Sequence, residues 1–143
     1  MAIFLDTGFY LGLCHPKDKY AEQSKRIFKQ LSEGDHGLLY TSSLIISEVT
    51  TLVAIRTNSH PKALNLLEEY VWGANKIAIE LYINSDLEPK IWELFKKINI
   101  IQKSKHDIAS FVDVSSIILC NKFQIDKIVS FDSHFDGFLT RIS

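Results

Sequence analysis

The chain has 143 residues, which is enough for one domain with a single hydrophobic core. Hydrophobic residues make up 46% and charged residues 23%, as in globular proteins, and the net charge of −1 excludes a purely charge-driven nucleic-acid binder. No apolar run approaches the roughly eighteen residues of a membrane span, and the N-terminus lacks the basic start of a secretory signal. We therefore expect a single domain over residues 1–143, without a membrane segment and located in the cytoplasm.

Short apolar runs rich in strand-forming residues alternate along the chain with segments of helical spacing. The predicted strands are residues 1–5, 37–41, 76–82 and 128–131. The predicted helices are residues 8–13, 20–31, 44–56, 60–73, 84–98 and 111–123. This alternation predicts an α/β fold, in which right-handed crossovers build a parallel sheet that helices cover on both faces.

Several finer expectations accompany these elements. A polar loop is predicted at residues 102–107, and an irregular segment from Asp132 to the end of the chain. The basic run over residues 17–29 indicates a solvated helix face. The apolar side chains expected to face the core from the helix over residues 60–73 are Leu64, Leu67, Val71 and Trp72.

The two cysteines, Cys14 and Cys120, each lie inside an apolar segment and have no CxxC partner. Cysteines in such surroundings are usually small buried apolar side chains. A disulfide between the two is the less favoured alternative.

Two acidic residues directly follow predicted strands: Asp6 after the first strand and Asp132 after the last. In an open parallel sheet the ligand crevice lies outside the carboxyl ends of the strands, so acids at these positions are candidates for a functional site. Either acid also suits a helix cap or a turn, and the residues alone leave this alternative open.

Two further acids lie on helices where water is scarce. Glu48 has Ile45 and Leu52 on the same helix face, so it lies at the border of the apolar stripe. Asp113 lies on a helix that is apolar almost all round. An ionised carboxylate is costly in such places unless a cation or hydrogen bonds accompany it. The alternatives are a Glu48 that reaches water and an Asp113 that forms a capping box with Ser110.

The fold can bring these four acids together at one crevice. Carboxylates that converge repel one another and take up protons, and a divalent cation removes the conflict. Oxygen ligands without a matching set of histidines or cysteines favour Mg²⁺ or Mn²⁺ over zinc. The candidate metal-binding and catalytic residues are Asp6, Glu48, Asp113 and Asp132.

The acid-bearing segments, taken in order, resemble those of the PIN-domain nuclease family, which includes the VapC-like toxins. The matching segments are residues 3–7, 47–49, 111–116 and 129–136, and the resemblance spans essentially the whole chain. It implies a three-layer α/β/α sandwich with a central parallel sheet of four to five short strands. It also implies a metal site at the four acids named above.

The activity implied by the resemblance is that of an Mg²⁺- or Mn²⁺-dependent endoribonuclease, which hydrolyses phosphodiester bonds of single-stranded RNA. Asp136 matches a second acid that some members carry, and the resemblance makes it a further candidate at the metal site, with holding a metal-bound water or a cap as the alternatives. Thr7 and Ser133 match supporting polar groups. A homodimer and, for a toxin of a toxin–antitoxin pair, an antitoxin protein are the implied protein partners.

Two other functions compete with this interpretation. A phosphatase of the haloacid dehalogenase type also has an aspartate after its first strand, but it needs a second acid where this chain has Gly8. A catalytically silent PIN-like module that binds RNA or protein is the alternative from another class, and the presence of all four acids argues against it. His15 and His134 are candidate substrate contacts, with capping or core roles as the favoured alternative.

Overall fold

The computed structural model describes residues 1–101 and 104–143, and in these residues five strands form one parallel sheet in the order β3–β2–β1–β4–β5. The strands are β1 (Ala2–Leu5), β2 (Leu38–Ser42), β3 (Ile79–Leu81), β4 (Lys127–Val129) and β5 (Thr140–Ile142). The α-helices of the described part are α1 (Thr7–Cys14), α2 (Ala21–Glu33), α3 (Ser43–Arg56), α4 (Pro61–Val71), α5 (Glu88–Ile100) and α6 (Phe111–Lys122).

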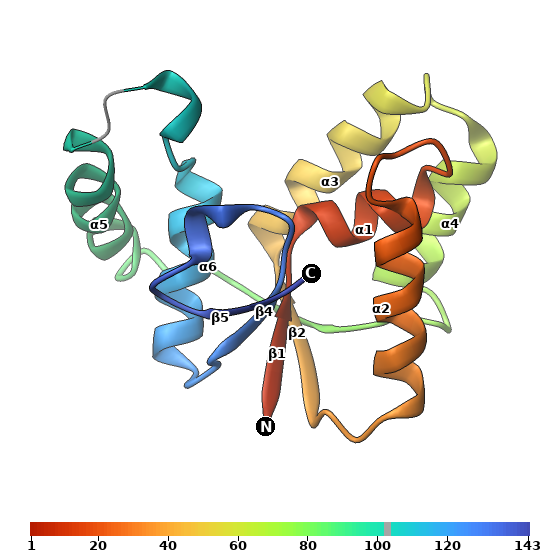
Figure 1. Cartoon of the computed structure of the whole chain (residues 1–143), viewed down its shortest axis with the longest axis horizontal. Coiled ribbons are helices and arrows are strands. Elements are labelled where there is room, and N and C mark those ends of the chain that lie inside the picture. Colours follow the sequence, from red (N-terminus) through yellow and green to blue (C-terminus); the bar gives the residue numbers. More distant parts are fainter. Residues whose placement is uncertain (102–103) are drawn as a thin grey trace.

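The sheet lies between two helical layers (Figure 1). Helices α5 and α6 pack together on one side, whereas α1, α2 and α4 lie on the other, and α3 packs against α1 and α4. The predicted three-layer α/β/α sandwich with a central parallel sheet is therefore confirmed. None of the helices in the described residues is long and apolar enough to cross a membrane.

Strand β1 is the centre of the sheet. It pairs with β2 on one side, where Ile3 is opposite Leu39, and with β4 on the other, where Phe4 is opposite Ile128. The side chains of Ile3, Phe4 and Leu5 are all buried. Such a continuous apolar run is expected for a parallel strand covered on both faces, and it places the residue that follows β1 in the middle of the carboxyl edge.

Polar side chains begin the helices at the predicted places. The Ser42 hydroxyl accepts a hydrogen bond from the Ile45 backbone N–H at 3.2 Å and caps α3. His60 caps α4, and Pro61 occupies its first turn. Proline is well tolerated there, because the backbone N–H that it lacks would have no partner in the first turn of a helix. Both cysteines are buried and free, which confirms their role as small core side chains and excludes the disulfide.

Three predictions about where elements begin and end are wrong. The segment after Asp132 is not irregular, because it contains β5, which pairs with β4 through Ile128 opposite Arg141. This strand is three residues long and lies at the sheet edge, so it leaves no recognisable periodicity in the sequence. The predicted helix over residues 84–98 begins later, at Glu88, and β3 keeps only the last part of the predicted strand.

The prediction that Trp72 faces the core is also wrong, because its side chain is 59% exposed. Helix α4 ends at Val71, and Trp72 has the non-helical backbone angles of a cap, so the helical spacing no longer applies to it. Of the other side chains predicted to face inward, Leu67 and Val71 are buried and Leu64 packs partly against the core.

The predicted polar loop at residues 102–107 begins with Gln102 and Lys103, which lie outside the described residues. Its second half forms a short 3-10 turn, Lys105–Asp107. The basic side chains Lys25, Arg26 and Lys29 of α2 are exposed, which confirms a solvated helix face.

Helices α1 and α2 approach each other closely at Gly12, where a Cβ atom would lie 2.7 Å from the Ser24 Cβ and 3.0 Å from the Tyr20 carbonyl oxygen. We predict that Gly12→Ala lowers the free energy of unfolding by about 1–3 kcal/mol, because the added methyl group forces the helices apart. Urea denaturation monitored by circular dichroism measures this change. In a Ser24→Gly background the same substitution should cost less, since its nearest neighbour has been removed, and equal costs in both backgrounds would contradict the proposed clash.

Candidate metal centre

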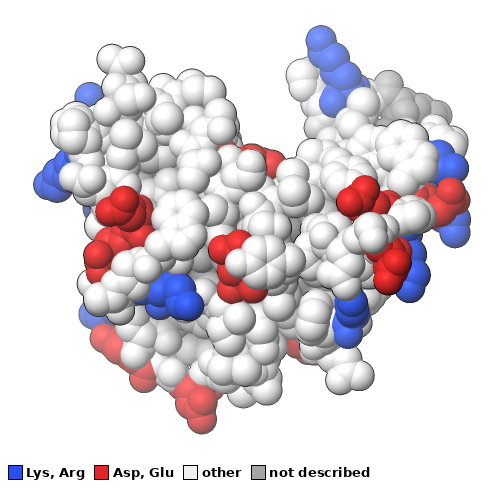
Figure 2. Space-filling model, turned by 180° about the vertical axis from the view of Figure 1, so that it is seen from behind, with Lys and Arg blue, Asp and Glu red and all other residues white. Residues whose placement is uncertain are grey.

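The four candidate acids converge on the carboxyl edge of the sheet. Asp6 follows β1 and Asp132 follows the neighbouring strand β4, while Glu48 lies on α3 and Asp113 on α6. Figure 2 shows a hollow at the edge of the molecule that corresponds to the strand carboxyl ends in Figure 1, with acidic side chains at its base. The elements that border this edge are therefore the ones that supply the acids.

Asp6 is buried, with 6% of its surface exposed, and it is linked to the end of β4. Its backbone N–H donates to the Val129 carbonyl at 3.1 Å, which extends the pairing of β1 and β4 by one residue. The Ser130 hydroxyl donates to Asp6 Oδ2 at 2.6 Å and accepts a hydrogen bond from the Asp132 N–H at 3.1 Å. One buried hydroxyl thus holds the side chain of the first acid and the backbone of the last.

Asp113 confirms the capping box that was considered for it. The Ser110 hydroxyl accepts from the Asp113 N–H at 3.0 Å, and Asp113 Oδ2 accepts from the Ser110 N–H at 3.2 Å. Asp113 Oδ2 also lies 3.3 Å from His134 Nδ1. The contacts with Ser110 and His134 both involve Oδ2, and Oδ1 has no hydrogen bond within the described residues. Asp113 can therefore cap α6 through Oδ2 and offer Oδ1 to a ligand.

Asp132 is arranged in the same way. Its Oδ1 accepts a hydrogen bond from the His134 backbone N–H at 2.9 Å, and this bond caps the short turn Ser133–Phe135. The same oxygen lies 3.0 Å from His134 Nδ1. Its Oδ2 has no hydrogen-bond partner in the part of the chain that the structure describes. Ligand atoms of Asp113, Asp132 and His134 lie within 4.8 Å of one another, a spacing that one cation can span.

The electrostatics of Asp6 link it to the other acids. Burial, followed by repulsion from Asp113 and Glu48, raises the pKa of Asp6 from 3.8 to about 7, against the opposing effects of the hydrogen bond from Ser130 and the Thr7 backbone. Near neutral pH this carboxyl is therefore balanced between its protonated and ionised forms. A neighbouring cation would favour the ionised form.

Glu48 and Asp113 experience the same effects. Burial raises the pKa of Glu48, and repulsion from Asp113 and Asp132 raises it further. Burial and repulsion from Asp132 likewise raise the pKa of Asp113, although its Ser110 and His134 contacts partly oppose this. These mutual repulsions are the electrostatic signature of carboxylates gathered without a balancing charge.

The Thr7 hydroxyl is a further sign that the site is built for a polar ligand. Its oxygen is buried and has no hydrogen-bond partner within the described residues. Its weak interaction with the Glu48 carboxylate lowers the pKa of that carboxyl, but the contact does not reach the geometry of a formed hydrogen bond. A buried polar group without a partner is uncommon in folded proteins, and a hydrated cation or an ordered water at the acids would satisfy it. The donor set therefore fits a hard divalent cation.

Asp136, the second C-terminal acid, lies apart from this group. Its Oδ1 and Oδ2 accept hydrogen bonds from Arg141 Nε and Nη2 at 2.9 and 3.2 Å. These contacts lower the pKa of Asp136. The structure therefore gives Asp136 a guanidinium partner and does not bring it to Asp113 and Asp132.

Sequence reasoning assigned no role to Ser130 or Arg141, and it did not foresee the contacts of His134. Ser130 directly precedes the Phe131–Asp132 pair, but a buried serine at a strand end carries no signal of its own partner. The His134 ring, a candidate substrate contact or cap, contacts two of the acids. His15 lies at the end of α1, where its backbone N–H donates to the Leu11 carbonyl at 2.9 Å.

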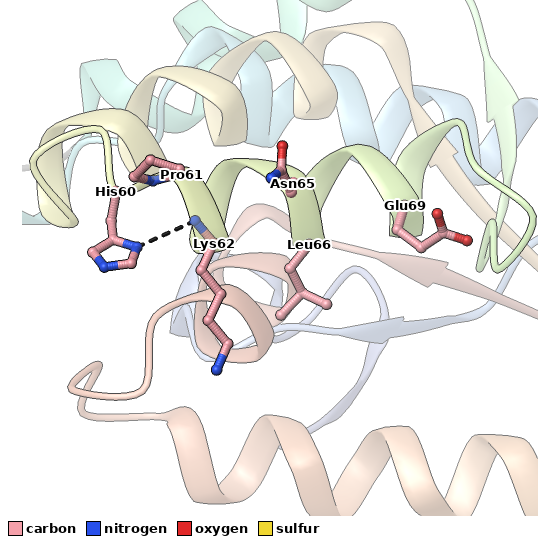
Figure 3. Close-up of a pocket in the computed structure, with 6 residues that line it drawn as sticks. All are labelled: His60, Pro61, Lys62, Asn65, Leu66 and Glu69. Atoms are coloured by element: carbon pink, nitrogen blue, oxygen red, sulfur yellow. Dashed lines mark hydrogen bonds between the residues drawn. The ribbon is translucent and has the colours of Figure 1, made fainter.

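A second hollow, of about 760 Å³, lies along α4 and away from the acids (Figure 3). The residues that line it are His60, Pro61, Lys62, Asn65, Leu66 and Glu69. The His60 ring accepts a hydrogen bond from the Lys62 backbone N–H at 3.2 Å, and the mix of apolar and charged side chains suits a protein surface better than the phosphodiester chemistry of an acid cluster.

The parallel sheet with acids gathered at its carboxyl edge defines a PIN-like α/β domain. No model of a known protein family matches the chain. The chain is 27% identical over 135 residues to a VapC ribonuclease of Archaeoglobus fulgidus, and the match covers 94% of this chain and 80% of the relative. Its fold is similar to the crystal structure of Mycobacterium tuberculosis VapC20, a sarcin–ricin loop cleaving toxin, with a TM-score of 0.76 and 24% identity over 96% of each chain.

These two matches confirm the resemblance to VapC-like PIN-domain nucleases that the sequence predicts. The sequence match and the structural match both span nearly the whole chain. The phosphatase alternative receives no support from either match.

The raised pKa of Asp6 predicts how the stability of the metal-free protein depends on pH. The folded state binds this proton more tightly than the unfolded chain, so the stabilisation is complete below about pH 4 and is lost as the pH rises through about 7. Between these limits, the free energy of unfolding of the wild type should fall by up to about 4 kcal/mol because of Asp6. Asp6→Asn should remove this contribution and make the protein more stable than wild type at about pH 8.

Urea denaturation in the presence of a chelator, repeated across this pH range, measures the effect. Asp35→Asn, which changes an exposed acid before β2 at the opposite edge of the sheet, is the matched control and should follow the wild-type curve. Parallel curves for wild type and Asp6→Asn would show that the burial of Asp6 is not linked to proton uptake.

Proposed function

We propose that the protein is a metal-dependent endoribonuclease that hydrolyses phosphodiester bonds of single-stranded RNA. The observation that carries this proposal is the group of acids at the hollow on the carboxyl edge of the sheet, with Asp113, Asp132 and His134 close enough to share one cation. The ribonuclease and the RNA-cleaving toxin to which the chain is similar support the same activity. The toxin of a toxin–antitoxin pair, active in the cytoplasm, is the biological role that we propose with it.

Asp6, Asp113 and Asp132 are the proposed ligands of one or two Mg²⁺ or Mn²⁺ ions, and Glu48 is a further ligand or a base in the outer shell. All these donors are carboxylate oxygens, which these hard ions prefer. When bound, such an ion supplies an activated water and balances the charge that develops on the phosphate. The repulsion that raises the pKa of Asp6 is then replaced by attraction, so the site binds the ion with its carboxylates ionised.

The protein side chains orient the reaction. Ser130 holds the Asp6 side chain and the Asp132 backbone, so the first and last acids keep a constant separation. Ser110 and His134 hold Asp113 by one oxygen, which leaves the other oxygen for the ligand. The half-buried Glu48 and the Thr7 hydroxyl lie beside the same acids, on the other helical layer. Glu48 would accept a proton from the attacking water, and the Thr7 hydroxyl would order that water.

Water, and not a ribose hydroxyl, is the proposed nucleophile, so the chemistry itself does not select RNA over DNA. Selection of single-stranded RNA would depend on the shape of the hollow and on contacts to unstacked bases. The relatives therefore support the substrate class, and the acids support the reaction class.

We also propose two protein partners, an antitoxin and a second copy of the chain. The hollow along α4 and the exposed Trp72 at the end of that helix support a protein contact on this face. An exposed tryptophan beside a hollow of mixed polarity is typical of protein interfaces. None of the four acids lines this hollow, so a partner bound at α4 would not cover their carboxylate oxygens.

We predict that Asp6→Asn or Asp113→Asn lowers the rate of Mn²⁺-dependent cleavage of single-stranded RNA by about 100-fold or more, because each removes an ionised ligand from the proposed centre. The measurement is a gel or fluorescence assay with purified protein and a labelled oligonucleotide. The control variant Asp35→Asn should cleave at the wild-type rate, and circular dichroism should show an unchanged fold for all three proteins.

The same assay tests the alternative, a catalytically silent module. A chelator should abolish cleavage by wild type, and Mn²⁺ or Mg²⁺ added in excess should restore it. Cleavage that persists in Asp6→Asn or in chelator would come from a contaminant or from another mechanism. RNA binding without cleavage in any divalent metal would favour the silent module.

A further inference from the structure

The segment that carries Asp132 and His134 is held at both ends by one side chain, Arg141 of the edge strand β5. At the far end, Arg141 Nε and Nη2 donate to the two carboxylate oxygens of Asp136 at 2.9 and 3.2 Å. At the near end, Arg141 Nη1 donates a longer hydrogen bond, of 3.5 Å, to the Ser130 carbonyl. The guanidinium therefore spans the segment from Ser130 to Asp136.

Ser130 connects this guanidinium to the acids. The carbonyl of Ser130 faces Arg141, whereas its hydroxyl binds Asp6 Oδ2 at 2.6 Å and the Asp132 N–H at 3.1 Å. The backbone N–H of Ser130 donates to the Ile142 carbonyl at 3.1 Å, next to Arg141 on β5. A shift of Ser130 relative to β5 would therefore move the two acids that follow β1 and β4.

The charges favour this arrangement. The Asp136 carboxylate raises the pKa of Arg141, and the Asp132 carboxylate contributes in the same direction, so the guanidinium lies near both acids of the segment. The Arg141 side chain is only 25% exposed, whereas Asp136 is 54% exposed. A planar guanidinium that binds both oxygens of a carboxylate fixes their relative position, which a lysine ammonium cannot do.

We propose that Arg141 is a positioning residue for the candidate metal centre, because it anchors the Asp132- and His134-bearing segment to β5 through Asp136 and Ser130. The inference rests on the proposed function, since Asp132 must bind a cation for its position to matter. Asp136 then serves as the anchor of the segment. The role differs from general stabilisation, because an ion pair at the sheet edge whose carboxylate is exposed contributes little to the stability of the whole fold.

The test measures Mn²⁺ binding by titration calorimetry or by the EPR signal of free Mn²⁺, together with the cleavage kinetics. Arg141→Met should raise the Mn²⁺ dissociation constant by about 10- to 100-fold and lower kcat, while KM for the RNA stays close to wild type. Arg141→Lys should resemble Arg141→Met, because it keeps the charge but loses the planar fork. Asp136→Asn should shift the same quantities, and the double variant should be no worse than the stronger single variant.

The matched control is Arg26→Met. Arg26 is an exposed arginine of α2 that also lies near the chain end, where its Nη2 donates to the Ser143 carbonyl at 3.3 Å, but it does not touch the segment. This variant should bind Mn²⁺ and cleave RNA as wild type does. Amide hydrogen exchange of the metal-free proteins gives a second readout, with exchange at residues 131–136 faster in Arg141→Met than in Arg26→Met.

Four outcomes would overturn the proposal. An unchanged Mn²⁺ dissociation constant in Arg141→Met removes the positioning role, and full recovery in Arg141→Lys assigns the effect to charge alone. A raised KM with unchanged Mn²⁺ binding assigns Arg141 to the RNA. Wild type that neither binds Mn²⁺ nor cleaves RNA would refute the proposed function as well, and hydrogen exchange would then show separately whether the anchor exists.

Discussion

The buried carboxylate of Asp6 is the constraint on which the rest of the site depends. It lies at the end of the central strand, where burial and two neighbouring acids favour its protonated form and the Ser130 hydroxyl favours the ionised form. A fold that brings like charges together in this way gives up stability at the site, and the apolar strands around it supply the compensating burial. A divalent cation is the simplest partner that changes repulsion among these acids into attraction.

The contacts that begin local structure also orient the acids. The Ser110–Asp113 capping box starts α6, and the hydrogen bond from His134 to Asp132 starts the short turn after β4. Each contact occupies one oxygen of a carboxylate, so a cap and a ligand can be the same residue. Asp113 and Asp132 can therefore each cap a helix or turn with one oxygen and bind a ligand with the other.

The C-terminal strand extends this relation to the edge of the sheet. Strand β5 is short and adds little burial, yet it carries Arg141, and its pairing with β4 determines where the residues after Val129 lie. The exposed Trp72 and the hollow along α4 lie on another face. The proposed catalytic surface and the proposed protein-contact surface are thus separate on this fold.

The sequence by itself determined the layers and most elements and marked the four candidate acids, because these follow from local patterns: the apolar run of β1, the Ser110–Asp113 capping box, and carboxylates at strand ends or on apolar helices. Only the tertiary structure decided what each acid touches, since hydrogen bonds such as Ser130 to Asp6 join residues 124 positions apart and leave no local pattern. The same holds for β5, which exists through its pairing with β4. Asp136 and Arg141 are only five positions apart, and they meet because that pairing places Arg141 on β5. Long-range pairing, and not propensity, sets these features.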